Sequence, residues 1–309
     1  MEQVLAAKKR KNKLNNMSAV AAICVYVPVV VFLLACLLPF IMVLSTSFSE
    51  SKQIEEFGVS LFPRGLSFDA YKTIFIYPDE ILLGYKNSII ITLIGTLCNV
   101  ALCIMAAYPL SKLDFKFRGM LSLSLFLSTA FSAGIVPQYM LYKNILHIYN
   151  TWWVLILPQI GNVGHVIFLR VFFQAIDNTY YEAARIEGAN EFGIMWKIAV
   201  PLIAPGIATV TFYSVLMYWN DASSALYFLD PASTEYMPIS VYITRMSQLI
   251  IFLQDVQKGM YPGISLGDMD IPEYTLQTAV VVITVAPMLC VFTFFQKYFV
   301  RGLTTGGIK

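Results

Sequence analysis

Few residues of this 309-residue sequence could carry catalytic or metal chemistry. The two histidines, His147 and His165, do not belong to an H-E-x-x-H pattern or any other ligand spacing, which argues against a zinc site. No G-x-x-x-x-G-K-[ST] string, which would bind a nucleotide phosphate, occurs. The cysteines fall inside apolar segments, where cysteine behaves as a small hydrophobic residue: Cys24, Cys36, Cys98, Cys103 and Cys290. We therefore expect no catalytic residue, no metal and no cofactor in this chain.

A second group of candidates consists of polar residues within or at the ends of long apolar segments. A charge at the centre of a membrane-spanning helix costs about 2.5–3.5 kcal/mol, and polar groups there usually face the interior of the bundle. The candidates for a substrate path are Asn99, Gln138, Asn162, Asn220, Asp221 and Gln277, with Gln159 and His165 as further polar groups. For any one of them, a hydrogen bond between helices, worth about 0.6 kcal/mol on average, is the more common explanation.

The elements that position these residues must be membrane helices. The chain is 58% hydrophobic and 13% charged, with a mean hydropathy of +0.67, which is too apolar for a soluble domain. A helix needs about 20 apolar residues to cross the hydrocarbon, because its backbone groups must bond internally there. Six segments meet this length, at residues 20–44, 88–110, 120–141, 152–173, 198–218 and 276–295. We predict an all-α integral membrane protein with six transmembrane helices, the first retained rather than cleaved as a signal peptide.

The distribution of Lys and Arg predicts the orientation, because these residues concentrate in short cytoplasmic loops. Of the 21 basic residues, 14 flank the segments on one side, including a cluster at residues 8–13. Residues 1–19 and 300–309 are therefore expected to be cytosolic tails of a transmembrane domain at 20–299. The net charge of +2 reflects this topology rather than nucleic-acid binding. Two long loops, 45–87 and 219–275, are expected outside; the aromatic residues of the second fit a membrane-interface belt and a partner surface equally well.

The cytosolic connection at residues 177–201 has the strongest local pattern. Thr179 and Glu182 are spaced as a capping box, which predicts a helix that begins at Tyr180. Gly188 is expected to end this helix in a left-handed conformation, and Asn190 to cap a second one.

Small residues mark one face of the predicted first helix. Ala184 and Gly188 are four residues apart, and Ala183 and Ala189 add little volume beside them. We expect that the backbone of another molecule can approach closely at this face.

The whole string resembles the loop that defines permease subunits of binding-protein-dependent ABC importers. It runs Glu-Ala-Ala at 182–184, then three residues, Gly188, and Ile-Ala-Val-Pro at 198–201. The resemblance implies the type I ABC-importer permease (MetI-like) fold, with a coupling helix that sits in a groove of a cytosolic ATPase. The matching positions are Glu182, Ala183, Ala184, Gly188 and Pro201. Glu187 and Val200 stand where the sugar-importing branch commonly has Asp and Leu.

Further matches extend the resemblance over nearly the whole chain. They are similar to the carbohydrate-uptake branch of the maltose-transporter inner-membrane subunit type, and within it to lipoprotein-C-like polysaccharide and oligosaccharide permeases. The matching stretches are residues 106–112, 117–119, 137–139, 150–152, 156–158, 168–170, 219–221 and 299–309. One departure is Asp177, which stands where Pro is usual.

The resemblance implies a set of partners and a location. The chain would provide half of a path for an oligosaccharide delivered by an extracytoplasmic binding protein. Its partners would be a second homologous permease subunit, forming a heterodimer, and two ATPase subunits that bind ATP and Mg. It would lie among the lipids of a bacterial inner or plasma membrane with both termini in the cytoplasm.

The sequence supports two other classes of function less well. An ion- or proton-coupled secondary transporter would be favoured by acidic residues at mid-membrane and by broken helices in repeated halves, which we do not find. His165 could titrate near neutral pH, but the fourth segment offers only Arg170 near its end as an ionisable neighbour. A membrane-embedded enzyme lacks ligand or nucleophile patterns.

Overall fold

A computed structural model describes residues 19–76, 78–131, 133–233, 235–257, 259–261 and 273–305. In these ranges the regular structure is helical, apart from one isolated β-bridge between Ser49 and Leu66. Three helices are long and apolar enough to cross a membrane, and three bent pairs of shorter helices raise the number of candidate spans to six. The prediction of an all-α, multi-pass membrane protein is confirmed.

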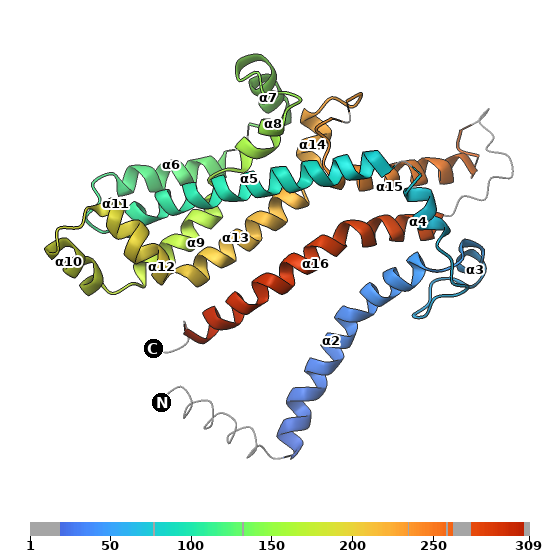
Figure 1. Cartoon of the computed structure of the whole chain (residues 1–309), viewed down its shortest axis with the longest axis horizontal. Helices are drawn as coiled ribbons and strands as arrows, with labels where there is room; N and C mark the ends of the chain where they lie inside the picture. The colour runs from blue at the N-terminus through green and yellow to red at the C-terminus, as the bar shows by residue number, and fades with distance from the viewer. Residues whose placement is uncertain are drawn as a thin grey trace. The chain divides into compact units, whose positions relative to one another are not determined.

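The described helices follow one another along the chain (Figure 1). In order they are α2 (Ala19–Ser47), α3 (Ser51–Phe57), α4 (Asp69–Ile74), α5 (Pro78–Ser111), α6 (Arg118–Ala130), α7 (Ile135–Met140), η1 (Leu141–Ile145), α8 (Trp152–Ile156), η2 (Leu157–Gln159), α9 (Val163–Gln174), α10 (Asn178–Ile186), α11 (Glu191–Ile194), η3 (Met195–Ala199), α12 (Val200–Leu202), α13 (Ala204–Trp219), α14 (Ser223–Phe228), α15 (Ile239–Gln257) and α16 (Glu273–Thr305).

Some predicted features lie outside the described residues. They are the basic cluster at 8–13, nearly all of the tail at 1–19, residues 306–309 of the C-terminal tail, and part of the loop at 219–275. The cytosolic placement of both tails therefore stays a prediction.

The chain divides into two compact units, of which the first comprises Met1–Ile74 and Asp268–Val282. In this unit Phe48 stacks on Tyr71 with ring centroids 5.0 Å apart, and the Tyr71 hydroxyl donates to Ser47 Oγ at 2.9 Å. These contacts hold the segment after α2 against the end of that helix. The most apolar stretch of α2 itself has no buried residue. A helix that is apolar on all sides requires lipid or another chain around it.

The second unit, Phe75–Gly267 and Ile283–Lys309, is built around α5. At 1.5 Å per residue the 34 residues of α5 extend over about 50 Å, well beyond the roughly 30 Å of membrane hydrocarbon. Helices α9 and α13 both pack along α5 (Figure 1). The α5–α13 contact is close at Gly95, where a Cβ atom would lie 2.7 Å from the ring of Tyr218. An alanine at this position would therefore force the two helices apart.

Two apolar clusters fill the second unit at separate stretches of α5. One surrounds Ile104 and Ala107 of α5 and includes Leu169, Phe173 and Ile194, all buried. The other surrounds Ile91 of α5 and includes buried residues of α8, α13, α14 and α15. Helix α5 thus connects the core beside α10 to the core beside α14.

The second predicted span begins earlier than its apolar run suggested. Helix α5 starts at Pro78 rather than Ser88, because proline suits the first helical position and Asp79 and Glu80 favour the positive end of the helix dipole. The predicted outer loops are also partly helical, since 45–87 contains α3 and α4 and 219–275 contains α14 and α15.

The third, fourth and fifth predicted spans are bent pairs rather than single helices. The fourth bends by 45° between η2 and α9, where Pro158 removes a donor and Gly161 adopts φ +74°. The fifth bends by 84° between α12 and α13, just before Pro205. The prolines and glycines at these breaks were visible in the sequence, but the apolar runs continued through them.

Candidate functional site

The loop between α9 and α13 begins with a cap that differs from the predicted one. Asp177 Oδ1 accepts from the backbone N–H of Thr179 at 2.9 Å and from its hydroxyl at 2.7 Å. These hydrogen bonds lower the pKa of Asp177, which is the N-cap of a helix that starts at Asn178. The predicted capping box of Thr179 and Glu182 was therefore wrong, because Asp177 accepts the Thr179 N–H and the Thr179 hydroxyl acts as a donor to Asp177 instead of as the cap acceptor.

The end of α10 follows the prediction. Gly188 has φ +84°, its N–H donates to the Arg185 carbonyl at 3.0 Å, and the Ala189 N–H donates to the Ala184 carbonyl at 3.0 Å. This pair of bonds is a Schellman motif. Asn190 then caps α11 by accepting from the Gly193 N–H at 2.7 Å. The predicted break between two short helices is confirmed.

The two faces of α10 have different neighbours. Tyr181 and Ala184 are only 3% and 5% exposed and belong to the core of this chain, whereas Glu182, Ala183 and Gly188 are exposed. The expectation that Ala184 and Gly188 form one open face was wrong, because Ala184 packs inward. The open small-residue surface consists of Ala183, Gly188 and Ala189 instead.

Sequence reasoning missed Ile186, the last residue of α10. Its side chain is 88% exposed, two residues before Gly188 in the same loop. Single exposed apolar side chains are common on protein surfaces. Next to the small-residue surface, however, Ile186 could bury its side chain in a partner protein. Its exposure follows from its place in the helix, two residues beyond buried Ala184 and five beyond buried Tyr181, and the sequence alone did not show that those two residues face the core.

The loop joins the fifth span through a π-helical turn. Met195–Ala199 form η3 and lead into the single turn of α12, which contains Pro201. Pro201 is exposed, and the chain bends by 84° directly after this turn. Pro201 therefore marks the exit of the loop and lies one turn before α13 begins.

Charged groups connect the loop to the neighbouring end of α5. Arg185 Nη2 lies 2.8 Å from Glu191 Oε1, and Tyr108 donates to Glu191 Oε2 at 2.9 Å. Partial burial acts to raise the pKa of Glu191, but the hydrogen bonds from Tyr108 and Arg185 outweigh it and hold the pKa below its usual range. Burial lowers the pKa of the neighbouring Lys112 to about 8. Glu191 is thus an ionised acceptor between two segments.

Of the predicted substrate residues, Asn99 forms hydrogen bonds that connect α5 to the fourth and fifth spans. It is fully buried, and its Oδ1 accepts from the backbone N–H groups of Gly161 and Asn162 at 2.8 and 3.2 Å. Its Nδ2 donates to Ser214 Oγ at 2.7 Å and lies 3.0 Å from His165 Nδ1. Backbone donors freed at a helix break need such partners inside a membrane. Asn99 therefore holds the break in the fourth span, and its place in a substrate path stays a prediction.

The same contacts assign the state of His165. Because Asn99 Oδ1 is an acceptor for two backbone N–H groups, its Nδ2 must be the donor to His165 Nδ1. The imidazole is then neutral, with its proton on Nε2. This arrangement suits a structural hydrogen bond better than a proton relay.

Two other predicted path residues, Asn162 and Asp221, lie at the break in the fourth span and just beyond the end of α13. Asn162 is exposed and caps α9 by accepting from the His165 N–H at 3.3 Å. Asp221 accepts from the side chain of Gln159 and from the Ser224 N–H. The structure thus joins the end of η2 to the end of the fifth span.

The remaining candidates are dispersed. Asn220 ends α13 with an exposed side chain that donates to the Leu216 carbonyl at 2.9 Å. Gln138 is half-buried on α7. Gln277 is exposed on the part of α16 that belongs to the first unit.

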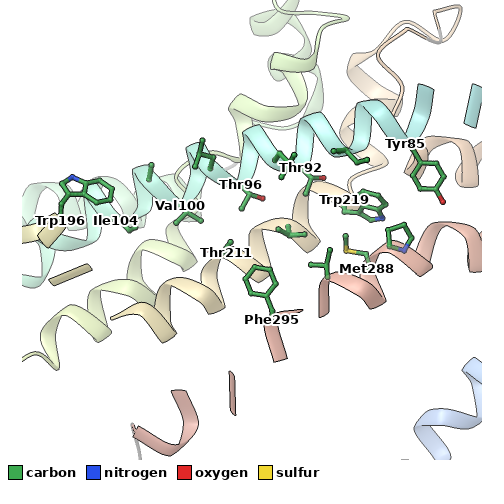
Figure 2. Close-up of a pocket in the computed structure, with 17 residues that line it drawn as sticks. Tyr85, Thr92, Thr96, Val100, Ile104, Trp196, Thr211, Trp219, Met288 and Phe295 are labelled. Atoms are coloured by element: carbon green, nitrogen blue, oxygen red, sulfur yellow. The ribbon is translucent and has the colours of Figure 1, made fainter. Parts of the chain in front are cut away.

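A cavity of about 650 Å³ lies where α5, α13 and the second part of α16 meet (Figure 2). Trp219, Met288 and Phe295 contribute to its mainly apolar wall, and the hydroxyls of Thr92 and Thr96 are its buried polar groups. None of the six predicted substrate residues lines it. This cavity could not be predicted from the sequence, because Thr92 and Thr96 occur within a long apolar run.

The described residues contain no group of three or more His, Cys, Asp or Glu side chains placed to hold a metal ion. The five cysteines are free thiols. The arrangement of polar groups therefore supports helix breaks and loop contacts rather than bond-making chemistry.

Comparison with known proteins identifies the family. A family model described as binding-protein-dependent transport system inner membrane component matches residues 4–305. The polygalacturonan/rhamnogalacturonan transport system permease protein YtcP of Bacillus subtilis (strain 168) is 33% identical over 299 residues, covering 97% of this chain and 99% of that protein. Protein LplC of the same organism is 33% identical and covers 88% of this chain and 89% of that protein.

A solved structure has the same fold. A chain of a bacterial ABC transporter involved in the import of the acidic polysaccharide alginate superposes with a TM-score of 0.76 at 26% sequence identity, over 92% of this chain and 99% of that one. The candidate membrane spans and the two-helix loop at 177–201 are consistent with these matches. This chain belongs to the family of binding-protein-dependent transport system inner membrane components, and it is a transport permease of the ABC importers rather than an enzyme.

Proposed function

We propose that this permease provides half of an ATP-driven import path for an oligosaccharide. The observation that carries the proposal is the loop at 177–201, a capped helix followed by a Schellman end, with Ile186, Ala183 and Gly188 exposed. A short, well-ordered helix with an apolar tip and small neighbours suits insertion into a groove of another protein. The surface agrees with ATPase coupling through Glu182, Ala183, Gly188 and the exit at Pro201, while Ala184 supports the helix from inside.

The substrate class rests on the relatives. One is named as a permease for polygalacturonan and rhamnogalacturonan, another for arabinooligosaccharides, and the structural neighbour imports alginate. All of these are chains of sugars. We assign the candidate contacts with sugar hydroxyls to Asn162, Asn220 and Asp221, with Gln159 bonded to Asp221.

The partners follow from the same proposal. An extracytoplasmic binding protein delivers the sugar, a second homologous permease completes the path, and two ATPase subunits bind ATP and Mg on the cytosolic side. The exposed apolar surface of α2 is consistent with lipid and a second membrane subunit around it. In this arrangement both termini and the loop at 177–201 face the cytoplasm of a bacterial cell.

Co-purification tests the proposal. The affinity-tagged chain is expressed together with candidate ATPase and permease subunits, extracted in mild detergent and analysed for stoichiometry. We expect one copy of each permease and two ATPase subunits. A chain that stays alone in detergent and moves sugar without ATP after reconstitution would overturn the proposal.

A further inference from the structure

The covalent chain connects the coupling loop to α9 and α13 but not to α5. On one side the loop follows the end of α9, and on the other it reaches α13 only after the 84° bend beyond α12. Helix α5 nevertheless packs along both α9 and α13 and is the longest helix of the second unit. Any direct coupling between the loop and α5 must therefore pass through side-chain contacts.

Such contacts are present at the cytosolic end of α5. Tyr108 donates to Glu191 Oε2 at 2.9 Å, and the other oxygen of Glu191 accepts from Arg185 Nε at 2.8 Å. Because Arg185 belongs to α10 and Glu191 to α11, this carboxylate joins three elements. The Lys112 Nζ atom lies 2.7 Å from the centre of the Tyr181 ring and 5.0 Å from that of Tyr108. A cation over two aromatic faces adds to the attachment.

The contacts are concentrated in a few side chains. A cavity of about 590 Å³ lined by Tyr108, Phe192 and Met195 adjoins them, and one of about 390 Å³ lined by Asn178, Glu182 and Phe173 adjoins them as well; both also include Lys112 and Arg185. Tyr181 and Ala184 also pack against the apolar cluster around Ile104 of α5. The hydrogen-bonded group therefore adds a directional polar attachment to this packing, beside open space that leaves room for the loop to shift.

The far part of α5 is attached in a similar way. Asn99 holds the break in the fourth span, and Asn87 Nδ2 donates to the carbonyls of Glu235 and Met237 at 2.8 and 3.0 Å. Movement of α5 along its axis would therefore displace both the break in the fourth span and the segment before α15.

We propose that Tyr108, Lys112, Arg185 and Glu191 form a clamp that makes α5 move with the coupling helix, so that Glu191 is a positioning residue for transport. The clamp gives ATP-driven displacement of α10 a route to the extracytoplasmic end of α5 that bypasses the bend before α13. This inference rests on the proposed function, since it assumes an ATPase docked on α10. It predicts that loss of the clamp separates ATP hydrolysis from transport.

The test uses the complete transporter in proteoliposomes with Tyr108→Phe, Glu191→Gln and Lys112→Met. Tyr108→Phe keeps the buried ring and removes only the hydroxyl, so it tests the clamp even where a charge change disturbs folding. The matched controls are Glu56→Gln and Lys116→Met, which remove exposed charges of the same types at positions outside the clamp. The readouts are subunit co-purification, basal ATP hydrolysis, and sugar taken up per ATP hydrolysed.

We expect normal co-purification and basal hydrolysis in all variants, and a fall of about tenfold in sugar uptake per ATP for the three clamp variants alone. The double variant Tyr108→Phe/Glu191→Gln should be no worse than Glu191→Gln, because Glu191→Gln already replaces the carboxylate to which Tyr108 donates. Unchanged uptake per ATP would overturn the clamp. Loss of co-purification would overturn it too, because it would show that these residues only maintain the docking surface for the ATPase. Failure of the unmodified chain to bind an ATPase would instead contradict the proposed function.

Discussion

Asn99 Oδ1 accepts the backbone N–H of Gly161 at 2.8 Å, so that a side chain of α5 completes the hydrogen bonding of a break in the fourth span. The break follows Pro158 and bends the span by 45°. Inside a membrane no water replaces such a partner without opening the bundle. The relationship explains why a neutral amide, rather than an apolar residue, occupies this position of α5.

Replacing Asn99 by alanine is expected to destabilise the protein. The change leaves the N–H groups of Gly161 and Asn162 without their acceptor, at a cost of about 1–3 kcal/mol for each donor that finds no substitute. Thermal unfolding in detergent should occur at a lower temperature than in the unmodified chain. Asn144→Ala, at an exposed position, serves as the control. Equal melting temperatures for both variants would contradict the assigned role.

Gly95 should tolerate no side chain. A Cβ atom there would lie 2.7 Å from the Tyr218 ring, which is buried, so Gly95→Ala must separate α5 from α13. Overpacking of this kind costs about 1–3 kcal/mol. Gly119→Ala is the matched control, because a Cβ at Gly119 meets no atom within 4 Å. We expect reduced yield of folded protein by size-exclusion chromatography for the first variant only.

At Gly188, a small and a large substitution separate backbone strain from docking. Both Gly188→Ala and Gly188→Trp carry the strain of φ +84°, about 1–2 kcal/mol. A Cβ here meets no atom of the described chain within 4 Å, so Trp should leave membrane insertion intact. We expect Gly188→Ala to retain the ATPase in pull-down assays and Gly188→Trp to lose it. Equal binding by both would show that the partner does not approach this surface.

Ile186 is expected to anchor the ATPase. Burial of one isoleucine side chain contributes about 1.5–3 kcal/mol, so Ile186→Ser should weaken ATPase binding by roughly 10- to 150-fold. Binding can be measured by titrating purified ATPase onto the permease dimer in nanodiscs. Leu113→Ser, at an 80% exposed position on the connection between α5 and α6, should leave the affinity unchanged. If both changes weaken binding equally, the docking surface is wider than α10.

Transport coupling should depend on pH through Lys112. Burial lowers its pKa to about 8, so its charge over Tyr181 is complete below about pH 7 and is lost as pH rises through 8 to about 9. The charged or titratable groups that face it are Tyr108, Asp114, Tyr181, Arg185 and Glu191. The pKa of Glu191 is lowered and that of Tyr181 is raised to about 12, so neither titrates in this window.

Sugar uptake per ATP is therefore expected to fall between about pH 7 and 9 in the unmodified transporter. Lys112→Arg keeps the positive charge at every pH in the range and should flatten the profile. Parallel declines in both proteins would assign the pH dependence to another group.

Much of the fold could be predicted from the sequence because membrane helices obey a simple length and polarity rule. The six candidate spans, the αL glycine at 188 and the cap at Asn190 all follow from local chemistry. The bends were missed because the apolar pattern continues through Pro158 and Pro205, and periodicity alone does not measure a change in direction.

The site was only partly predictable for a related reason. The choice of Asp177 over Thr179 as the cap depends on the Asp177 carboxylate accepting from both the N–H and the hydroxyl of Thr179, which the spacing of Thr179 and Glu182 did not show. The burial of Ala184 and the exposure of Ile186 depend on where α5 lies beside α10, which no local pattern specifies. The role of Asn99 likewise required knowing that α5 passes the break at Gly161.

The most direct test of the account is uptake of labelled oligosaccharide into proteoliposomes that contain this chain, its partner permease and the ATPase subunits, with the binding protein outside and ATP inside. The account predicts uptake that requires both ATP and the binding protein and that Gly188→Trp abolishes. Uptake by this chain alone, driven by an ion gradient without ATP, would contradict it.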